Sequence, residues 1–510
     1  MDLENARLRA RVAELEEQNA QLLRGNAKLR LSRRIGTVAN AVSTGGASAS
    51  TDVAVVDSAD TDMPFLNGVE VGLDTVGTEL YRHAKTLMPQ GCGLISKRPE
   101  SFLPELWPSY YAKAQGPFVW DLSGNKYMDM CNAPGPYALG AADPDVNAAV
   151  IKVVEAGSFS TLNPPEEVEL AELLIELHPW CKGGMVRYAR GGGEINMLAA
   201  RIARAATNRD RIAVCGYHGW VDWYIAANYQ GSDSSEGGRK LAADPRYETD
   251  GTGHTTTGVP AHLAGSAIPW DYDRIDELRA IFEAYPGEIA AVMMEVARSE
   301  TPPDGHLQAV RTLCDQYGAV LIFDEVSSAW RLNLGGRHLL YGVEPDMCTF
   351  SKTLSNGFAM AAVIGRHEVM QPAEKSFIST TYHTERVGPA AACATIKKMR
   401  ATGAIEHNNA MGRLIKDGMV AAAAKCGLTI TISGIDCWAS FKFGDAPSVY
   451  SAAPGAQSQS PLMTLYTQEM LRRGFLSYGT SMPTYAHKEA HIRVPTYTYR
   501  VSSHLGTPKS

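Results

Sequence analysis

The sequence has few features of secreted, metal-binding or membrane-spanning proteins. Its nine cysteines are scattered along 510 residues and include no CxxC pair, so we expect neither a disulfide framework nor a zinc site. No apolar run reaches the roughly 18 residues of a transmembrane helix. The first residues include several acidic side chains and no apolar core, which argues against a transit or secretory peptide. We therefore expect a cytoplasmic protein without a metal centre.

An excess of positive charge is also absent. The net charge is −7, and a mildly acidic protein has no general attraction to nucleic acid or to a membrane surface. Hydrophobic residues make up 45% of the chain and charged residues 20%, which is typical of globular proteins. The length is sufficient for two or more domains with a large core.

Residues 1–31 carry a heptad leucine repeat. The leucines are Leu8, Leu15, Leu22 and Leu29. If these are d positions, three of the four a positions are asparagine, which favours a parallel dimer in register. The alternative is a single amphipathic helix packed on its own protein. Residues 32–74 contain a stretch rich in small residues and are predicted to be a flexible linker.

Between residues 165 and 365, apolar runs alternate with helical patterns. The strand candidates are Met185–Ala189, Arg211–Cys215, Ala290–Glu295, Val320–Phe323 and Ala361–Ile364. The helix candidates are 166–178, 194–206, 273–284 and 306–317. This alternation predicts βα units and a mostly parallel sheet, with ligands at the carboxyl ends of its strands.

Two polar residues follow apolar runs in this region. Asp324 ends the run that begins at Ala319, and Lys352 lies between apolar or small segments. A lysine and an aspartate at strand ends suit pyridoxal phosphate (PLP): the amine forms a Schiff base with the cofactor, and the carboxylate keeps the pyridine nitrogen protonated. The alternatives are a solvated surface lysine and an aspartate that caps a helix or forms a structural ion pair.

Other segments suit the same cofactor. Gly192 and Gly193 follow a strand and open a helix, as in a phosphate cradle, although a tight turn explains them equally well. Tyr217 and His218 follow the next strand, where an aromatic ring can stack on a cofactor or pack in the core. Val326 faces the same way as Asp324 in an extended chain and is predicted to press against the cofactor ring.

Together these segments resemble the class III (subgroup II) PLP-dependent aminotransferases, in the branch similar to glutamate-1-semialdehyde aminomutase. The resemblance runs from about residue 85 to 495. Its segments are Phe118–Asp129, Leu139–Pro144, Gly192–Glu194, Ile202–Arg209, Gly216–Trp220, Phe323–Val326, Tyr341–Asp346 and Phe350–Gly357.

The resemblance implies the α/β architecture of fold-type I transferases. A large PLP-binding domain with a mostly parallel seven-stranded-type sheet would span residues 146–385. A smaller α+β domain would combine residues 75–145 and 386–510. The resemblance also implies a homodimer with shared active sites, and the coiled-coil helix of residues 1–31 would either tie one dimer together or join dimers into a higher oligomer.

The resemblance also implies residue roles. Lys352 would be the Schiff-base lysine and proton shuttle, and Asp324 would pair with the pyridine nitrogen. The other cofactor-binding candidates are Gly192, Gly193, Tyr217, His218, Val326 and Thr381, with Thr380 as the alternative to Thr381. Thr381 would reach the phosphate bound by the partner subunit. The substrate-binding candidates are Arg98, Arg298 and Glu300, which could equally form surface salt bridges.

The chain departs from the family pattern at two cofactor positions. Gly193 replaces the usual serine or threonine of the phosphate loop, and Ser327 replaces a glutamine that many members carry. Neither change removes the lysine or the aspartate.

We therefore predict a PLP-dependent enzyme that moves an amino group between an amine or amino acid and a keto or aldehyde acceptor. One alternative is another PLP reaction, such as an intramolecular 2,1-aminomutase or a racemase. The other is a catalytically idle coiled-coil scaffold with an aminotransferase-like body.

Overall fold

The computed structural model describes residues 71–132, 135–228, 258–297, 301–444 and 461–492. The leucine repeat, most of the predicted linker, Arg298 and Glu300 lie outside these residues. The chain forms two compact units, and the described part of the smaller one comprises residues 71–114, 118–129 and 464–476. No helix in the described ranges combines the length and apolar character of a membrane span.

The smaller unit is built on a four-stranded sheet of order β1-β2-β3-β13. Its strands are β1 (Tyr111–Gln115), β2 (Phe118–Asp121), β3 (Lys126–Asp129) and β13 (Phe475–Leu476). Between β2 and β3 the Asp121 carboxylate accepts the backbone N–H groups of Ser123 and Asn125, which closes the hairpin. Helix α2 (Thr75–Ala84) precedes β1 in the sequence, and helix α12 (Pro461–Arg472) precedes β13.

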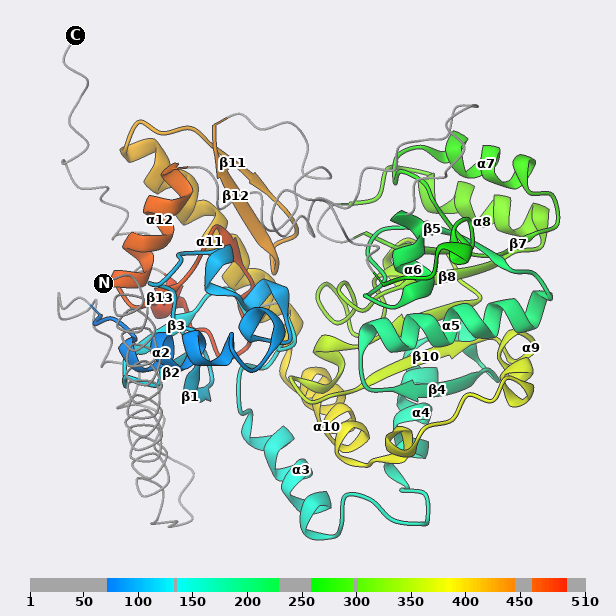
Figure 1. The fold of residues 1–510 in the computed structure, drawn as a ribbon, viewed down its shortest axis with the longest axis horizontal. Helices are drawn as coiled ribbons and strands as arrows, with labels where there is room; N and C mark the ends of the chain where they lie inside the picture. Colours follow the sequence, from blue (N-terminus) through cyan, green and yellow to red (C-terminus); the bar gives the residue numbers. More distant parts are fainter. Residues whose placement is uncertain (1–70, 133–134, 229–257, 298–300, 445–460, 493–510) are drawn as a thin grey trace, which may run out of the picture. The chain divides into compact units, whose positions relative to one another are not determined.

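The larger unit contains a seven-stranded sheet of order β4-β10-β9-β8-β7-β5-β6 (Figure 1). Its strands are β4 (Met185–Ala189), β5 (Arg211–Cys215), β6 (Ala267–Pro269), β7 (Ile289–Glu295), β8 (Val320–Asp324), β9 (Met347–Phe350) and β10 (Ala361–Gly365). The pairs from β6 to β9 are parallel, whereas β10 is antiparallel to both of its neighbours. The predicted α/β fold with a mostly parallel sheet is confirmed.

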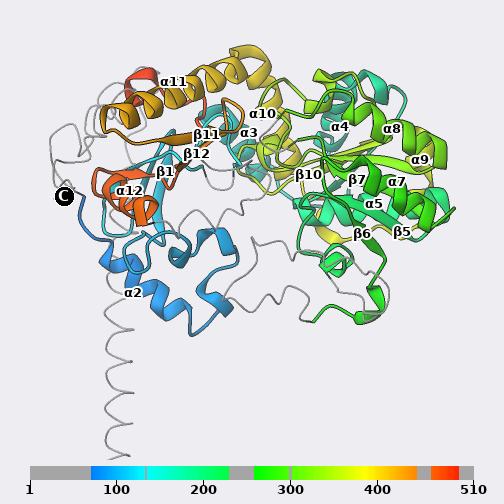
Figure 2. The ribbon, with the colours of Figure 1, turned by 90° about the horizontal axis from the view of Figure 1, so that it is seen from above.

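Helices cover both faces of this sheet. The α-helices of the larger unit in the described ranges are α3 (Pro144–Glu155), α4 (Glu166–Leu177), α5 (Gly192–Thr207), α6 (Asp222–Ile225), α7 (Ile275–Ala284), α8 (His306–Tyr317), α9 (His367–Met370), α10 (Val387–Thr402) and α11 (Ala404–Lys425). Apolar residues of α5 pack on one face, and those of α4, α7, α8 and α10 pack on the other (Figures 1 and 2).

The two-sided covering explains the sequence of the central strand. In β8, Leu321 and Phe323 join one apolar core and Ile322 joins the other, because successive side chains point to opposite faces. All five residues of β8 are buried, and the first four form a continuous apolar run. Asp324 is the first residue to break that run, at the carboxyl end of the strand.

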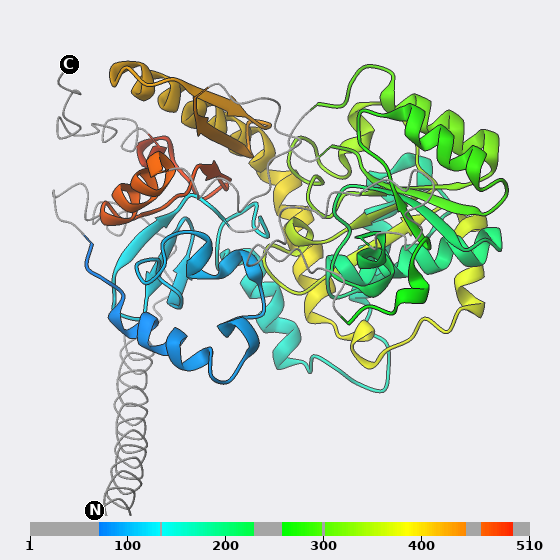
Figure 3. The same cartoon turned by 45° about the horizontal axis from the view of Figure 1, so that its top comes forward.

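A small third sheet completes the larger unit. It has the order β11-β12-β14 and comprises β11 (Ile430–Ser433), β12 (Ala439–Phe443) and β14 (Thr480–Ser481). The long helix α11 packs along β11 and β12 (Figure 3). Gly412 of α11 lies so close to the loop at Asp436 that a side chain there has no space.

Candidate active site

Asp324 and Lys352 belong to neighbouring strands that end at the same edge of the sheet. Strands β8 and β9 are parallel, and Asp324 pairs with Thr349 in their register. Lys352 follows β9 and opens a short 3-10 helix, η10 (Lys352–Ser355). Its φ of 48° lies in the left-handed region, which a non-glycine residue adopts only when its surroundings hold it there.

The Asp324 carboxylate is buried and accepts three hydrogen bonds. Asn196 Nδ2 donates to Oδ2 at 2.7 Å, His218 Nδ1 donates to Oδ2 at 2.8 Å, and the Val326 N–H donates to Oδ1 at 3.0 Å. Thr349 Oγ1 donates to Asn196 Oδ1 at 2.7 Å, which fixes the orientation of the amide. These donors offset the cost of burying an ionised carboxylate.

His218 lies behind Asp324 in this arrangement. Its side chain is fully buried, and Nδ1 carries the proton that it donates to the carboxylate. His218, a predicted cofactor residue, therefore contacts Asp324. The neighbouring Tyr217 is only partly buried. The Tyr217 backbone N–H donates to Glu295 Oε2 at 3.2 Å, and its ring lies edge-on to Tyr224.

The Lys352 amine lies against a serine hydroxyl. Nζ donates to Ser327 Oγ at 2.6 Å. Arg331 Nε in turn donates to the carbonyl of Ser327 at 2.6 Å, and its Nη2 donates to the carbonyl of Gly135 at 2.9 Å. Thr353 Oγ1 donates to the same Gly135 carbonyl at 3.2 Å. The segment that carries Ser327 and the segment that carries Lys352 are therefore both held by this carbonyl.

The glycine segment forms a tight helix N-terminus. Helix α5 begins at Gly192, and no side chain caps its first N–H groups. A Cβ on Gly192 would lie 2.8 Å from Val326 Cγ1, and one on Gly219 would lie 2.5 Å from the Cα of Gly193. Uncapped N–H groups at the positive end of a helix dipole bind anions, so this segment fits a phosphate group.

The predicted threonines lie beside the glycine segment. Thr380 and Thr381 are exposed, and Thr381 opens the 3-10 helix η12 (Thr381–Thr384). Arg190, which directly precedes the glycines, donates to the carbonyls of His383 and Glu385 at 3.1 and 2.6 Å. The threonine segment is therefore attached to the strand-to-helix loop that carries the cradle.

The predicted substrate residues lie outside the described part of the larger unit. Arg98 lies in the smaller unit, between the short 3-10 helices η3 (Ile95–Lys97) and η4 (Pro99–Ser101). Its role in substrate binding stays a prediction, as do the roles of Arg298 and Glu300 outside the described residues.

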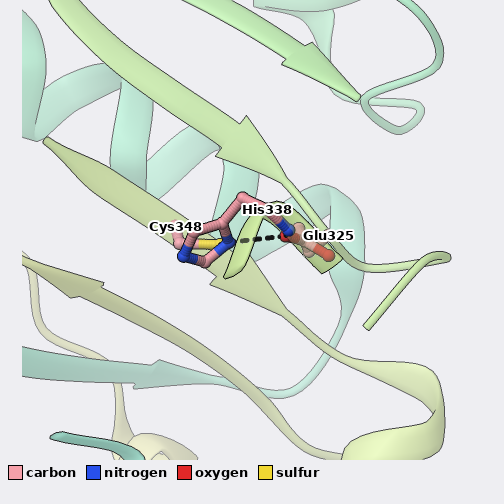
Figure 4. Close-up of side chains that lie close together, drawn as sticks. All are labelled: Glu325, His338 and Cys348. Carbon is pink, nitrogen blue, oxygen red and sulfur yellow. Dashed lines mark hydrogen bonds and ion pairs between the residues drawn. The ribbon is translucent and has the colours of Figure 1, made fainter. Parts of the chain in front are cut away.

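A separate buried cluster joins Glu325, His338 and Cys348 (Figure 4). The Glu325 carboxylate accepts from His338 Nδ1, from Ser328 Oγ and from the backbone N–H groups of residues 337 and 338. His338 Nε2 accepts the indole N–H of Trp180 at 2.7 Å. Every ligand atom of Glu325 and His338 is therefore already in a hydrogen bond, so a metal ion would have to displace these bonds.

This cluster stabilises the segment that follows Asp324. Burial on its own would raise the pKa of Glu325, but the hydrogen bonds from His338 and Arg337 keep that pKa below its usual range. Burial raises the pKa of the Cys348 thiol well above its usual range, so the thiol stays protonated. The result is a fixed loop between β8 and η9 (Arg337–Leu340).

Sequence reasoning missed Asn196 and Arg331, and noted Ser327 only as a departure from the family. Asn196 does carry a signal, because it is a polar residue on the buried face of α5, next to Ile195 and one turn from Gly192. Arg331 is a buried cation close to Asp324 in the chain, but nothing local indicates which carbonyls it contacts.

The fold and this site define a PLP-dependent transferase of the aminotransferase type. The chain belongs to the class-III aminotransferase family, whose family model matches residues 105–435. PLP is the cofactor of this family, and the chain is accordingly a PLP-dependent aminotransferase or aminomutase.

Two curated relatives have different activities. The chain is 32% identical over 363 residues to a 3-aminobutyryl-CoA aminotransferase of Cloacimonas acidaminovorans, a match that covers 70% of this chain and 80% of the relative. It is 33% identical over 387 residues to a glutamate-1-semialdehyde 2,1-aminomutase of Methanothrix thermoacetophila, with 73% and 83% covered. An omega-transaminase from Sphaerobacter thermophilus shares the fold, with a TM-score of 0.70, 24% identity and 83% and 96% covered.

Proposed function

We propose that the protein transfers an amino group between an amine or amino acid and a keto or aldehyde acceptor, with Lys352 as the covalent attachment point of PLP. The observation that carries this proposal is the pairing of Asp324 with Thr349 across two parallel strands. This register brings the carboxylate and the lysine segment to one edge of the sheet, beside a glycine-rich helix N-terminus.

Each part of the cofactor has a residue to hold it. The N–H groups of Gly192 and Gly193 would bind the phosphate, and Asp324 would bind the pyridine nitrogen. Val326, which touches the glycine segment, would lie against one face of the ring and Tyr217 against the other. The bound cofactor supplies an electron sink, and the Asp324 carboxylate, supported by His218, keeps the ring nitrogen protonated.

Lys352 would have a second role once its nitrogen is released. Its amine would take a proton from the α-carbon of the substrate and deliver it to C4′ of the cofactor. This transfer needs a neutral amine close to both carbons, and the left-handed backbone of Lys352 presents the side chain from a fixed position.

We also infer a homodimer with shared sites, in which Thr381 reaches the phosphate in the partner subunit. Several apolar side chains of the larger unit are largely exposed in the single chain. They are Phe159, Leu162, Trp220, Phe377 and Tyr382. Phe159 packs edge-on against Tyr382, next to Thr381, and a second subunit would cover these two exposed rings. The heptad repeat of residues 1–31 would add to this assembly.

Absorption spectroscopy tests the attachment point. Purified protein should show the visible band of PLP bound to a lysine, and Lys352→Ala should lose it. Lys375→Ala, which removes an exposed lysine, is the matched control and should keep the band. Borohydride reduction followed by peptide mapping should place the cofactor on Lys352. An unchanged spectrum in Lys352→Ala contradicts the proposal.

The aminomutase relative supports a second candidate within the same chemistry. Product analysis separates the two, because an aminomutase turns over without an added acceptor whereas an aminotransferase stops after one half-reaction. The idle-scaffold alternative is disfavoured by the intact lysine and the three hydrogen bonds of Asp324, and failure to bind PLP would support it.

A further inference from the structure

The Lys352 amine has a neighbour to which the proposed function assigns no role. Nζ donates to Ser327 Oγ at 2.6 Å, and Ser327 is only 8% exposed. Ser327 lies three residues after Asp324 on the same loop. The end of β8 therefore presents both the carboxylate for the cofactor and a hydroxyl for the lysine.

Ser327 is itself held in place. Arg331 is 6% exposed and donates from Nε to the Ser327 carbonyl and from Nη2 to the Gly135 carbonyl. Thr353, the residue after the lysine, donates to the same Gly135 carbonyl. The loop that carries the hydroxyl and the loop that carries the amine thus share an anchor, which limits how far Nζ and Oγ can separate.

The chemistry of the partner suits an amine that moves protons. A hydroxyl is a neutral acceptor, so it orients Nζ without favouring the ammonium form as a carboxylate would. A neutral amine oriented in this way would direct its lone pair at the substrate proton. Ser327 keeps its own proton throughout, so the transfer requires no further acid or base.

We infer that Ser327 is the residue that positions Lys352 Nζ for proton transfer, with Arg331 acting through Ser327. This inference rests on the proposed function and deepens it. It also gives a role to a residue at which the chain departs from the common family pattern.

The test compares three substitutions of Ser327 with a matched control. Ser327→Ala removes the hydroxyl, Ser327→Cys keeps the size but replaces it with a weak acceptor, and Ser327→Thr retains it. Ser355→Ala is the control, because Ser355 also lies in the lysine loop but donates to the backbone carbonyl of Phe358. The Cys variant keeps the test decisive if Ser327→Ala fails to fold.

Single-turnover bleaching of the cofactor band by an amine measures the effect. We expect the Ala and Cys variants to slow bleaching about 10- to 100-fold, the range expected for a misplaced reacting group. The deuterium isotope effect for an amine labelled at the α-carbon should rise, because proton transfer then limits the rate. Ser327→Thr and Ser355→Ala should resemble the wild type in both measurements.

A second measurement uses the cofactor-free protein. The rate at which it takes up PLP should fall in Ser327→Ala and Ser327→Cys but not in Ser355→Ala, because the attacking amine is no longer held in position. Wild-type bleaching rates and isotope effects in both the Ala and the Cys variants would overturn the inference and leave the proposed function intact. A wild-type protein without the cofactor band would overturn both.

Discussion

Asn196 Nδ2 lies 2.7 Å from Asp324 Oδ2, and this contact joins helix α5 to the end of strand β8. Thr349 of β9 holds the other end of the amide. A single side chain thus connects the helix that begins with the glycine segment, the strand that carries the carboxylate and the strand that leads to the lysine. The relative positions of the three groups depend on it.

Asn196→Ala should lower both stability and cofactor affinity. The change leaves the Thr349 hydroxyl without its acceptor and removes one donor from the buried Asp324, so the free energy of unfolding should fall by about 1–3 kcal/mol. Cofactor affinity, measured by titrating PLP into the cofactor-free variant, should fall about tenfold, equivalent to about 1.4 kcal/mol.

Asn408→Ala is the control for this change. Asn408 is also buried, and its amide donates to the Ala138 carbonyl. Its loss should cost stability but leave cofactor affinity unchanged. An Asn196→Ala protein that binds PLP as tightly as the wild type would show that Asp324 is held without the amide.

Much of the large sheet could be predicted from local patterns. The apolar runs at β4, β5, β7, β8 and β10 are visible in the sequence, and each lies within a residue of its predicted limits. The antiparallel orientation of β10, the limits of β9 and the short strand β6 were not predicted. The orientation of β10 and the pairing of β6 depend on strands distant in the chain, which local patterns do not report.

The same distinction applies to the site. Asp324 and Lys352 stand out because each is a polar residue next to an apolar strand. The partner of Asp324 on α5 is 128 positions away, and the carbonyl that receives Arg331 Nη2 is 196 positions away. Such contacts arise only when the elements pack. A single sequence therefore indicates Asp324 and Lys352, the proposed functional groups, more readily than Asn196 and Arg331, which hold them in position.

His178 should make the protein less stable in mild acid. Burial lowers the pKa of His178 to about 4. Its neutral form is satisfied on both sides, because Nδ1 donates to the Leu174 carbonyl and Nε2 accepts the Gly336 N–H. Between pH 6.5 and 4, His178 binds a proton in the unfolded chain but not in the folded chain. The contribution of neutral His178 to the free energy of unfolding is therefore fully present above pH 6.5 and is lost as the pH falls.

The free energy of unfolding should fall by about 3 kcal/mol between about pH 7 and pH 4 because of His178. Denaturant unfolding across this range measures it, and His178→Gln should show a shallower decline because glutamine does not titrate. His367→Gln, which replaces an exposed histidine, should decline as steeply as the wild type. Equal slopes for wild type and His178→Gln would show that other groups cause the acid sensitivity.

Arg331→Lys should affect proton transfer only through Ser327. A lysine lacks the planar fork that lets Arg331 donate to two carbonyls at once, so the Ser327 loop should loosen and single-turnover bleaching should slow about 3- to 10-fold, a smaller effect than direct loss of the hydroxyl.

A double-mutant cycle checks this order of action. In a Ser327→Ala background the arginine change should have little further effect, because the hydroxyl that it positions is already absent. Thermal unfolding of all four proteins separates the kinetic effect from general destabilisation. Full additivity of the two rate effects would mean that Arg331 acts on the site by another route.

A shared active site predicts complementation between two inactive proteins. Lys352→Ala lacks the proposed attachment lysine, and Thr381→Glu places a negative charge where we propose that the phosphate of the partner's cofactor lies. In a mixed dimer, the Thr381→Glu subunit would provide Lys352 and the Lys352→Ala subunit would provide Thr381. One of the two sites would therefore be complete.

Coexpression with two affinity tags isolates this mixed dimer for an activity assay. We expect it to recover up to about half of the wild-type activity per dimer, because one site of two is intact. Each parent dimer alone should stay inactive, since both of its sites carry the same defect. A purified mixed dimer as inactive as its parents would show that Thr381 does not serve the neighbouring site.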